Sequence, residues 1–80
     1  MRLVARDIKG NIKEWSIEEL DYPNALIRTG RLNGNLIETI ISHNNIHSEI
    51  ASRITKKRKE GYVSLKDLGY SQKFYEESVQ

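Results

Sequence analysis

The chain contains no cysteine and only one proline. The first absence excludes disulfide cross-links and thiolate zinc sites, and secreted domains of this size more often carry a disulfide. Long apolar runs are also missing: none spans a bilayer, and Arg2 and Arg6 interrupt the only candidate for a signal-peptide core. We therefore expect a cytoplasmic protein with no membrane partner, whose stability comes from its core and hydrogen bonds.

That core must be thin. Eighty residues, of which 38% are hydrophobic and 30% charged, form at most one domain, and such a domain buries only roughly 60–65% of its unfolded surface. The net charge of +2 decides little about partners, but the charges are clustered. Basic residues dominate positions 1–13 and 46–60 and acidic residues dominate 14–24, so the surface should be bipolar. A basic region of this size either meets phosphate or is a solvated polar face.

Four segments rich in apolar and β-branched residues alternate with turn clusters, which indicates antiparallel strands in sequence order. The predicted strands cover residues 2–8, 12–20, 25–29 and 36–42. The predicted turns cover residues 9–11, 21–24 and 30–35. In the second strand, Trp15 and Ile17 fall on one face, whereas Glu14 and Glu18 fall on the other, which is expected to be exposed. A lone tryptophan in this setting favours a core role over a stacking role.

From residue 46 the apolar period changes. Ile46, Ile50 and Ile54 recur every four residues, which predicts an amphipathic helix with a basic last turn and a stop at Gly61. A short extended segment at 62–63 and a single turn at 64–68 should follow. The sequence thus predicts a small α+β domain over residues 1–70, with a meander-like antiparallel sheet of about four strands, one helix packed on one face, and a polar tail over 71–80.

The residues that catalysis requires are not grouped in a recognisable way. His43 and His47 have a helical ligand spacing but no accompanying ligand cluster, which favours solvated or capping histidines over a metal site. There is no glycine-rich phosphate loop followed by Lys-Ser or Lys-Thr. We therefore expect no enzyme activity, no metal and no cofactor.

Basic side chains gather in three places: the first predicted hairpin, the bend around Gly30, and the end of the helix. Arginine binds phosphate oxygens through two parallel hydrogen bonds, and glycine lets a ligand approach the backbone closely. Arg28 and Arg31 beside Gly30 are therefore candidates to grip a phosphate, with a solvated or ion-paired arginine as the alternative. The candidate nucleic-acid-binding residues are Arg28, Gly30, Arg31, Lys9, Lys13, Lys56 and Lys59.

Three stretches in this order resemble the WGR domain family over about residues 2–65: KEWSI at 13–17, IRTGRLNG at 27–34 and KRKEGYV at 57–63. The opening RDIKGNIKEW at 6–15 is also similar to WGR-like segments of phage proteins, some joined to DNA ligases. In this chain the family's Gly and Arg fall on Gly30 and Arg31, but its Trp position is Thr29. Threonine offers a hydroxyl where the aromatic residue could stack on a base.

The resemblance implies a non-enzymatic module that binds DNA, with ends or nicks among the targets, as an accessory of replication, repair or ligation in the cytoplasm of a phage host. In the poly(ADP-ribose) polymerases the WGR domain engages DNA breaks and relays this to a catalytic domain. The rival hypothesis is a module that binds a host or replication protein through a sheet edge or the acidic segment 14–21. The sequence leaves open the choice between DNA and RNA and the oligomeric state.

Overall fold

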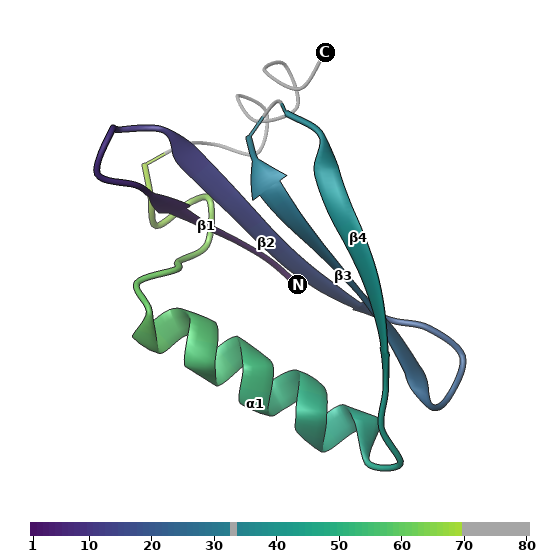
Figure 1. Ribbon diagram of the computed structural model, residues 1–80. Helices are drawn as coiled ribbons and strands as arrows, with labels where there is room; N and C mark the ends of the chain where they lie inside the picture. The colour runs from purple at the N-terminus through teal and green to yellow at the C-terminus, as the bar shows by residue number, and fades with distance from the viewer. Residues whose placement is uncertain (33, 70–80) are drawn as a thin grey trace.

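A computed structural model of the chain describes residues 1–32 and 34–69. One antiparallel sheet is followed by one helix (Figure 1). The strands lie side by side in sequence order and are β1 (Arg2–Arg6), β2 (Ile12–Glu19), β3 (Asn24–Arg31) and β4 (Leu36–Ser42). Helix α1 (Ile46–Lys59) crosses one face of the sheet. The predicted α+β meander is confirmed, and the predicted tail at 71–80 lies outside the described residues.

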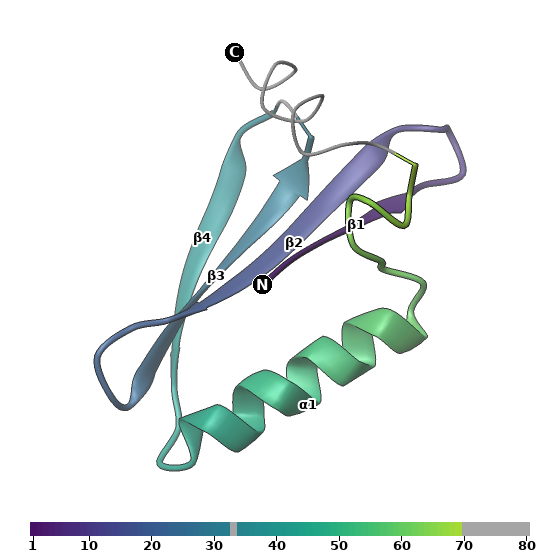
Figure 2. The same ribbon diagram turned by 180° about the vertical axis from the view of Figure 1, so that it is seen from behind.

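Alternation along the strands divides the side chains between two faces. Trp15 pairs with Leu3 on one side and with Thr29 on the other, and these residues lie on the face that α1 covers, here called the helix face. Glu14 pairs with Val4 and Gly30 on the opposite side, here called the far face. Figure 2 shows the same sheet from behind.

The core lies between the sheet and the isoleucine row of α1. Its buried members are Leu3, Trp15, Ile17, Ala25, Ile27 and Ile46, and Ile41, Ile50, Ile54 and Tyr62 pack around them. Trp15 is only 3% exposed, so its predicted role as a core residue is confirmed. Burial of an aromatic ring of this size is a large part of the hydrophobic stabilisation in a chain this short.

Helix α1 ends as the sequence predicts. Gly61 has a φ of +100°, which a residue without a Cβ adopts at little cost. Its N–H donates to the Arg58 carbonyl and the Tyr62 N–H donates to the Lys57 carbonyl, the hydrogen-bond pair of a Schellman motif. This motif turns Tyr62 back against the last turn of the helix.

The chain after the helix closes the outer edge of β1. Val63 and Val4 exchange backbone hydrogen bonds of 2.8 and 2.9 Å, and Leu65 then packs on Val4 from the far face. A single turn over residues 65–69 follows, as predicted. Among the described residues, no helix is long and apolar enough to cross a membrane.

Two strand ends differ from the prediction by two residues, and the end of β2 and the start of β3 differ from it by one. Strand β1 ends at Arg6, because the Asp7 carboxylate accepts hydrogen bonds from the N–H groups of Lys9 and Asn11 and so begins the turn earlier. Strand β3 continues through Gly30 to Arg31, where the sequence had indicated a turn. This second difference decides where the two arginines point.

Candidate nucleic-acid interface

A groove of about 280 Å³ lies on the helix face between α1 and strands β3 and β4. Its floor is formed by Trp15, Ile27, Thr29, Thr39 and Ile41 on the sheet. Its helix side is formed by Arg53, Lys56, Lys57 and Glu60. Three cations and one carboxylate therefore stand beside an apolar floor that carries two threonine hydroxyls, a combination suited to an anionic ligand with an apolar part.

Two lysines are held together by aromatic rings at the end of this groove. The Lys57 Nζ lies 5.1 Å from the Tyr62 ring centroid and 5.9 Å from that of Trp15. The Lys13 Nζ lies 5.6 Å from the same Tyr62 ring. The negative faces of the rings offset part of the repulsion between the ammonium groups, and Lys57 also pairs with Glu60 at 3.4 Å.

Arg31 joins this set from the neighbouring strand. It lies directly opposite Lys13 in the β2–β3 ladder, and both side chains project on the helix face. Arg31 is exposed, and no ion pair or cation–π contact to it occurs among residues 1–32 and 34–69. Two like charges therefore face each other across the ladder without a carboxylate between them.

The other predicted lysines are placed differently. Lys56 lines the groove. Lys59 is exposed on the last turn and is not one of the lining residues. Lys9 is exposed in the β1–β2 turn, away from the groove.

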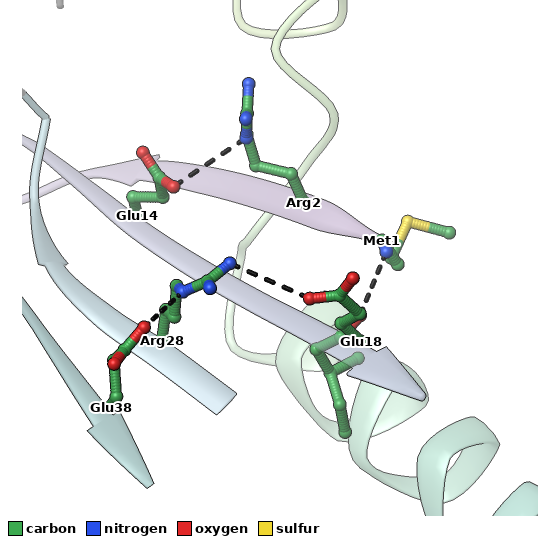
Figure 3. A network of polar contacts seen from close by, with 7 residues as sticks. Met1, Arg2, Glu14, Glu18, Arg28 and Glu38 are labelled. Atoms are coloured by element: carbon green, nitrogen blue, oxygen red, sulfur yellow. Dashed lines mark hydrogen bonds and ion pairs between the residues drawn. The ribbon is translucent and has the colours of Figure 1, made fainter. Parts of the chain in front are cut away.

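Arg28 lies on the far face, away from Arg31. The two positions are three residues apart in one strand, so their side chains project to opposite sides of the sheet. Figure 3 shows Arg28 between two carboxylates: its Nε–H donates to Glu38 Oε2 at 2.7 Å, and a guanidinium nitrogen lies 3.7 Å from Glu18. The hydrogen bond to Glu38 raises the pKa of Arg28 above its ordinary value. The hypothesis that Arg28 and Arg31 converge on one phosphate is therefore wrong.

Gly30 serves the hairpin itself. A Cβ at this position would lie 2.7 Å from the Asn35 carbonyl oxygen and 3.0 Å from a Leu36 methyl group. The space that the sequence interpretation assigned to a ligand is filled by the chain's own β3–β4 connection. Glycine is therefore required here for the close approach of the protein backbone to itself.

A larger cleft of about 860 Å³ opens on the far face. Its lining includes Arg28, Glu18, Glu14 and Arg2 (Figure 3). Arg2 lies 3.7 Å from Glu14, which is only 5% exposed, so the expectation of an exposed Glu14 is wrong. The lining also includes Lys66 and Met1, so basic groups outnumber the two carboxylates, but Arg2 and Arg28 each stand beside one of these carboxylates.

Most carboxylates of the acidic segment 14–21 have ion-pair partners within the molecule. Glu14 and Glu18 face the two arginines of the far-face cleft, and Glu19 lies 3.3 Å from His47 Nδ1. The second candidate histidine, His43, accepts the Asn45 N–H on its Nδ1 at 2.9 Å. In the described part of the chain, no three His, Asp or Glu side chains are grouped so as to hold a metal ion.

The sequence does not predict Arg53 and Lys57 as binding residues, although both line the groove. A signal was available: Arg53 follows Ile46 by seven residues and Lys57 follows Ile50 by seven, so both share the inward side of the helix. Both side chains are half-buried, as expected for long basic residues whose aliphatic stems lie on apolar surface while their charges stay in water. The four-residue spacing of the isoleucines alone does not show that these two basic residues share their side of the helix.

Comparison with protein-family models, curated proteins and solved structures finds no match for this chain.

Proposed function

We propose that this chain is a non-enzymatic module that binds the phosphate backbone of nucleic acid through the helix face. The residues concerned form the basic face, defined as Lys13, Arg31, Arg53, Lys56 and Lys57. The observation that carries the proposal is the Lys13–Arg31 pair, two opposed cations that project together without a neutralising carboxylate.

The contrast between the two faces supports this assignment. On the far face each basic residue drawn in Figure 3 stands beside a carboxylate. On the helix face, Arg53 and Lys57 pair with Glu49 and Glu60, whereas no ion pair to Lys13, Arg31 or Lys56 occurs among residues 1–32 and 34–69. Like charges placed directly opposite each other across a ladder destabilise the sheet. A polyanion that neutralises them would remove this repulsion and gain charge-assisted hydrogen bonds.

The side-chain groups that line the groove suit contacts with the phosphate backbone of a nucleic acid rather than recognition of its bases. Lysine ammonium and arginine guanidinium groups bind phosphate oxygens, and the hydroxyls of Thr29 and Thr39 are additional donors at the floor. Phosphate contacts position a protein but carry no sequence information. Binding should therefore be weakly specific and steeply dependent on salt, because each neutralised phosphate releases counterions.

The resemblance to WGR domains agrees with this location. Thr29 stands at the family's tryptophan position and lies on the floor of the groove, with Arg31 two residues further on the same face. A smaller side chain at position 29 leaves the floor open. We accordingly place the proposed contacts on phosphates along the groove and assign no aromatic stacking to position 29.

A fluorescence-anisotropy titration tests the proposal. Blunt, nicked and single-stranded DNA, and an RNA of the same sequence, are titrated with the whole chain at about 50 and 200 mM salt. With roughly four phosphates contacted, affinity should fall about a hundredfold between these salt concentrations. Arg31→Glu should weaken binding at low salt. It should also make the affinity less dependent on salt, by the equivalent of about one or two phosphate contacts.

Lys66→Glu is the matched control. It makes the same change in net charge from an exposed position that lines the far-face cleft. Retained affinity in this variant, together with loss in Arg31→Glu, would separate the basic face from a general effect of charge. Equal losses in the two variants, or undetectable binding by the natural chain at low salt, would refute the proposal.

The rival function, binding of a host or replication protein, is weakened for the acidic segment because three of its carboxylates, those of Glu14, Glu18 and Glu19, already have intramolecular partners. A pull-down after nuclease treatment separates the two functions. A protein captured equally with and without nuclease supports the rival, and loss of all captured material with the nucleic acid supports the module proposed above.

A further inference from the structure

The outer edge of β4 is the one long strand edge that the described residues leave unpaired. Strand β4 pairs with β3 on its inner side, and in both Figure 1 and Figure 2 no described element lies beyond it. The opposite edge of the sheet is closed where Val63 pairs with Val4. One edge of the sheet is therefore paired with a later segment of the chain, whereas the described residues leave the other edge open.

The hydrogen-bond pattern identifies the groups that point outward. The His43 N–H donates to the Pro23 carbonyl at the end of the β3–β4 ladder. Because bonded and non-bonded pairs alternate in an antiparallel ladder, odd-numbered residues of β4 direct their backbone groups to β3 and even-numbered ones direct them outward. We define the β4 edge as the outward backbone groups of Leu36, Glu38, Ile40 and Ser42.

The devices that usually protect an edge strand are missing here. Strand β4 extends over seven residues and contains no proline and no lysine. Its one charge, on Glu38, is engaged by Arg28. Ile37 and Ile40 are 70% and 64% exposed and lie on opposite faces of the strand. A long apolar edge of this kind is a template for another strand.

We propose that the β4 edge pairs antiparallel with the β4 edge of a second copy of this chain, with the twofold axis at Thr39. This register overlaps the whole strand. It sets Ile37 opposite Ile41 of the second copy and Thr39 opposite its own counterpart, pairings that favour antiparallel sheets. It also sets Glu38 opposite Ile40, so no like charges meet.

The neighbouring register is less favourable. Moving the axis to Glu38 would place the two Glu38 carboxylates directly opposite each other and leave Ile41 and Ser42 beyond the overlap. A shift by a single residue in the pairing is excluded, because it would bring opposite faces of the two sheets together. Self-complementarity of the strand around Thr39 is therefore the argument for a second copy over an unrelated strand.

The proposed dimer is a continuous sheet in which both helices lie on the same side. In the chain itself α1 packs on β3 and runs from the end of β4 toward β1, which leaves the β4 edge clear (Figure 1). The two grooves would then flank the junction between the copies. This assembly rests on the β4 edge alone and does not require that the basic face binds nucleic acid.

Sedimentation equilibrium of the nuclease-treated whole chain, from low micromolar to millimolar concentration, tests the proposal. The natural chain should show a reversible monomer–dimer equilibrium. Ile40→Pro removes an outward N–H and leaves the β3 ladder intact, so this variant should remain a monomer. A monomeric natural chain at every concentration, or an Ile40→Pro variant that dimerises normally, would overturn the proposal.

Two charge variants test the register. Ile40→Glu places a carboxylate opposite Glu38 of the second copy, whereas Ile40→Lys places an ammonium there. Both variants lose the isoleucine, so the difference between them reports the opposing charge. The lysine variant should associate several-fold more tightly than the glutamate variant, and equal association would overturn the register.

Ile8 provides the matched control for these substitutions. It is an isoleucine that is fully exposed in the β1–β2 turn, far from the β4 edge. Ile8→Glu and Ile8→Lys should leave the dimer constant unchanged, and a change as large as that at position 40 would count against the β4 edge. Thermal unfolding of each variant by circular dichroism shows that it is folded, as expected for substitutions at exposed positions.

Discussion

Lys13 and Arg31 lie opposite each other on β2 and β3, and both project on the helix face. In an antiparallel ladder the odd-numbered pairs of these two strands are the non-hydrogen-bonded ones, in which opposed side chains approach most closely. The Leu32 N–H, which donates to the Ile12 carbonyl beside this pair, fixes that alternation. The sheet therefore holds two cations close together at the place where the groove begins.

This arrangement predicts that Arg31→Gln changes stability and binding in opposite directions. Removing one of two opposed cations should raise the free energy of unfolding by roughly 0.2–1 kcal/mol. The same substitution should weaken nucleic-acid binding, because a phosphate contact is lost. Urea denaturation and an anisotropy titration measure the two quantities.

Arg28→Gln is the comparison for this prediction. It removes an arginine that is hydrogen-bonded to Glu38 on the far face, so stability should fall and binding should stay unchanged. If Arg31→Gln instead lowers stability and leaves affinity intact, Arg31 is a structural residue and the basic face loses its central member.

The only tryptophan reports directly on the groove. Trp15 is buried, yet it lines the floor and lies under the Lys57 ammonium group. Saturation of the basic face with nucleic acid should displace that ammonium group and change the intensity of the tryptophan emission. Lys57→Gln should reduce this change. An emission spectrum that stays constant while anisotropy reports saturation would place the ligand elsewhere.

The strand order, the helix and its glycine stop could be predicted from the sequence. Each depends on local apolar periodicity or on a glycine that can adopt a positive φ. The sequence was insufficient at Gly30, since glycine is as typical of turns as of close strand contacts. Pairing with Glu14 on one side and Leu36 on the other keeps this residue in β3. That long-range pairing, which is invisible in the local sequence, sends Arg28 and Arg31 to opposite faces.

The same limit applied to the candidate site. Arg31, Lys13 and Lys56 were predicted as binding residues, and the fold brings them to one face. The sequence does not predict Arg53 and Lys57, because a charged residue beside an apolar row is normally interpreted as solvated. Their place in the groove depends on the packing of α1 across the sheet, which the spacing of isoleucines defines only approximately.

Two glycines should respond differently to substitution because their constraints differ. At Gly30 the obstacle is steric, since a Cβ would collide with the Asn35 carbonyl, and Gly30→Ala should cost about 1–3 kcal/mol. At Gly10 the space is open but φ is +84°, so Gly10→Ala should cost about 1–2 kcal/mol.

Substitution of each glycine by asparagine, followed by chemical denaturation, distinguishes the two constraints. Asparagine tolerates a positive φ better than alanine, so Gly10→Asn should recover part of the lost stability. Gly30→Asn should recover none, because a side chain of any kind meets the backbone of residue 35. A recovery of stability in Gly30→Asn would show that the two strands of the β3–β4 hairpin can move apart. The close approach of their backbones would then not be required.

The closed edge of β1 leads to the last prediction. Val63→Pro removes the N–H that donates to the buried Val4 carbonyl at 2.9 Å, which should cost about 1–3 kcal/mol and free the β1 edge. The sheet would then have an open edge at each end, and pairing through both would extend the assembly beyond a dimer. Sedimentation velocity should detect larger species in Val63→Pro, and addition of Ile40→Pro should limit them by closing the β4 edge. Larger species that persist unchanged in the double variant would mean that association proceeds through unfolded chains rather than through the two strand edges.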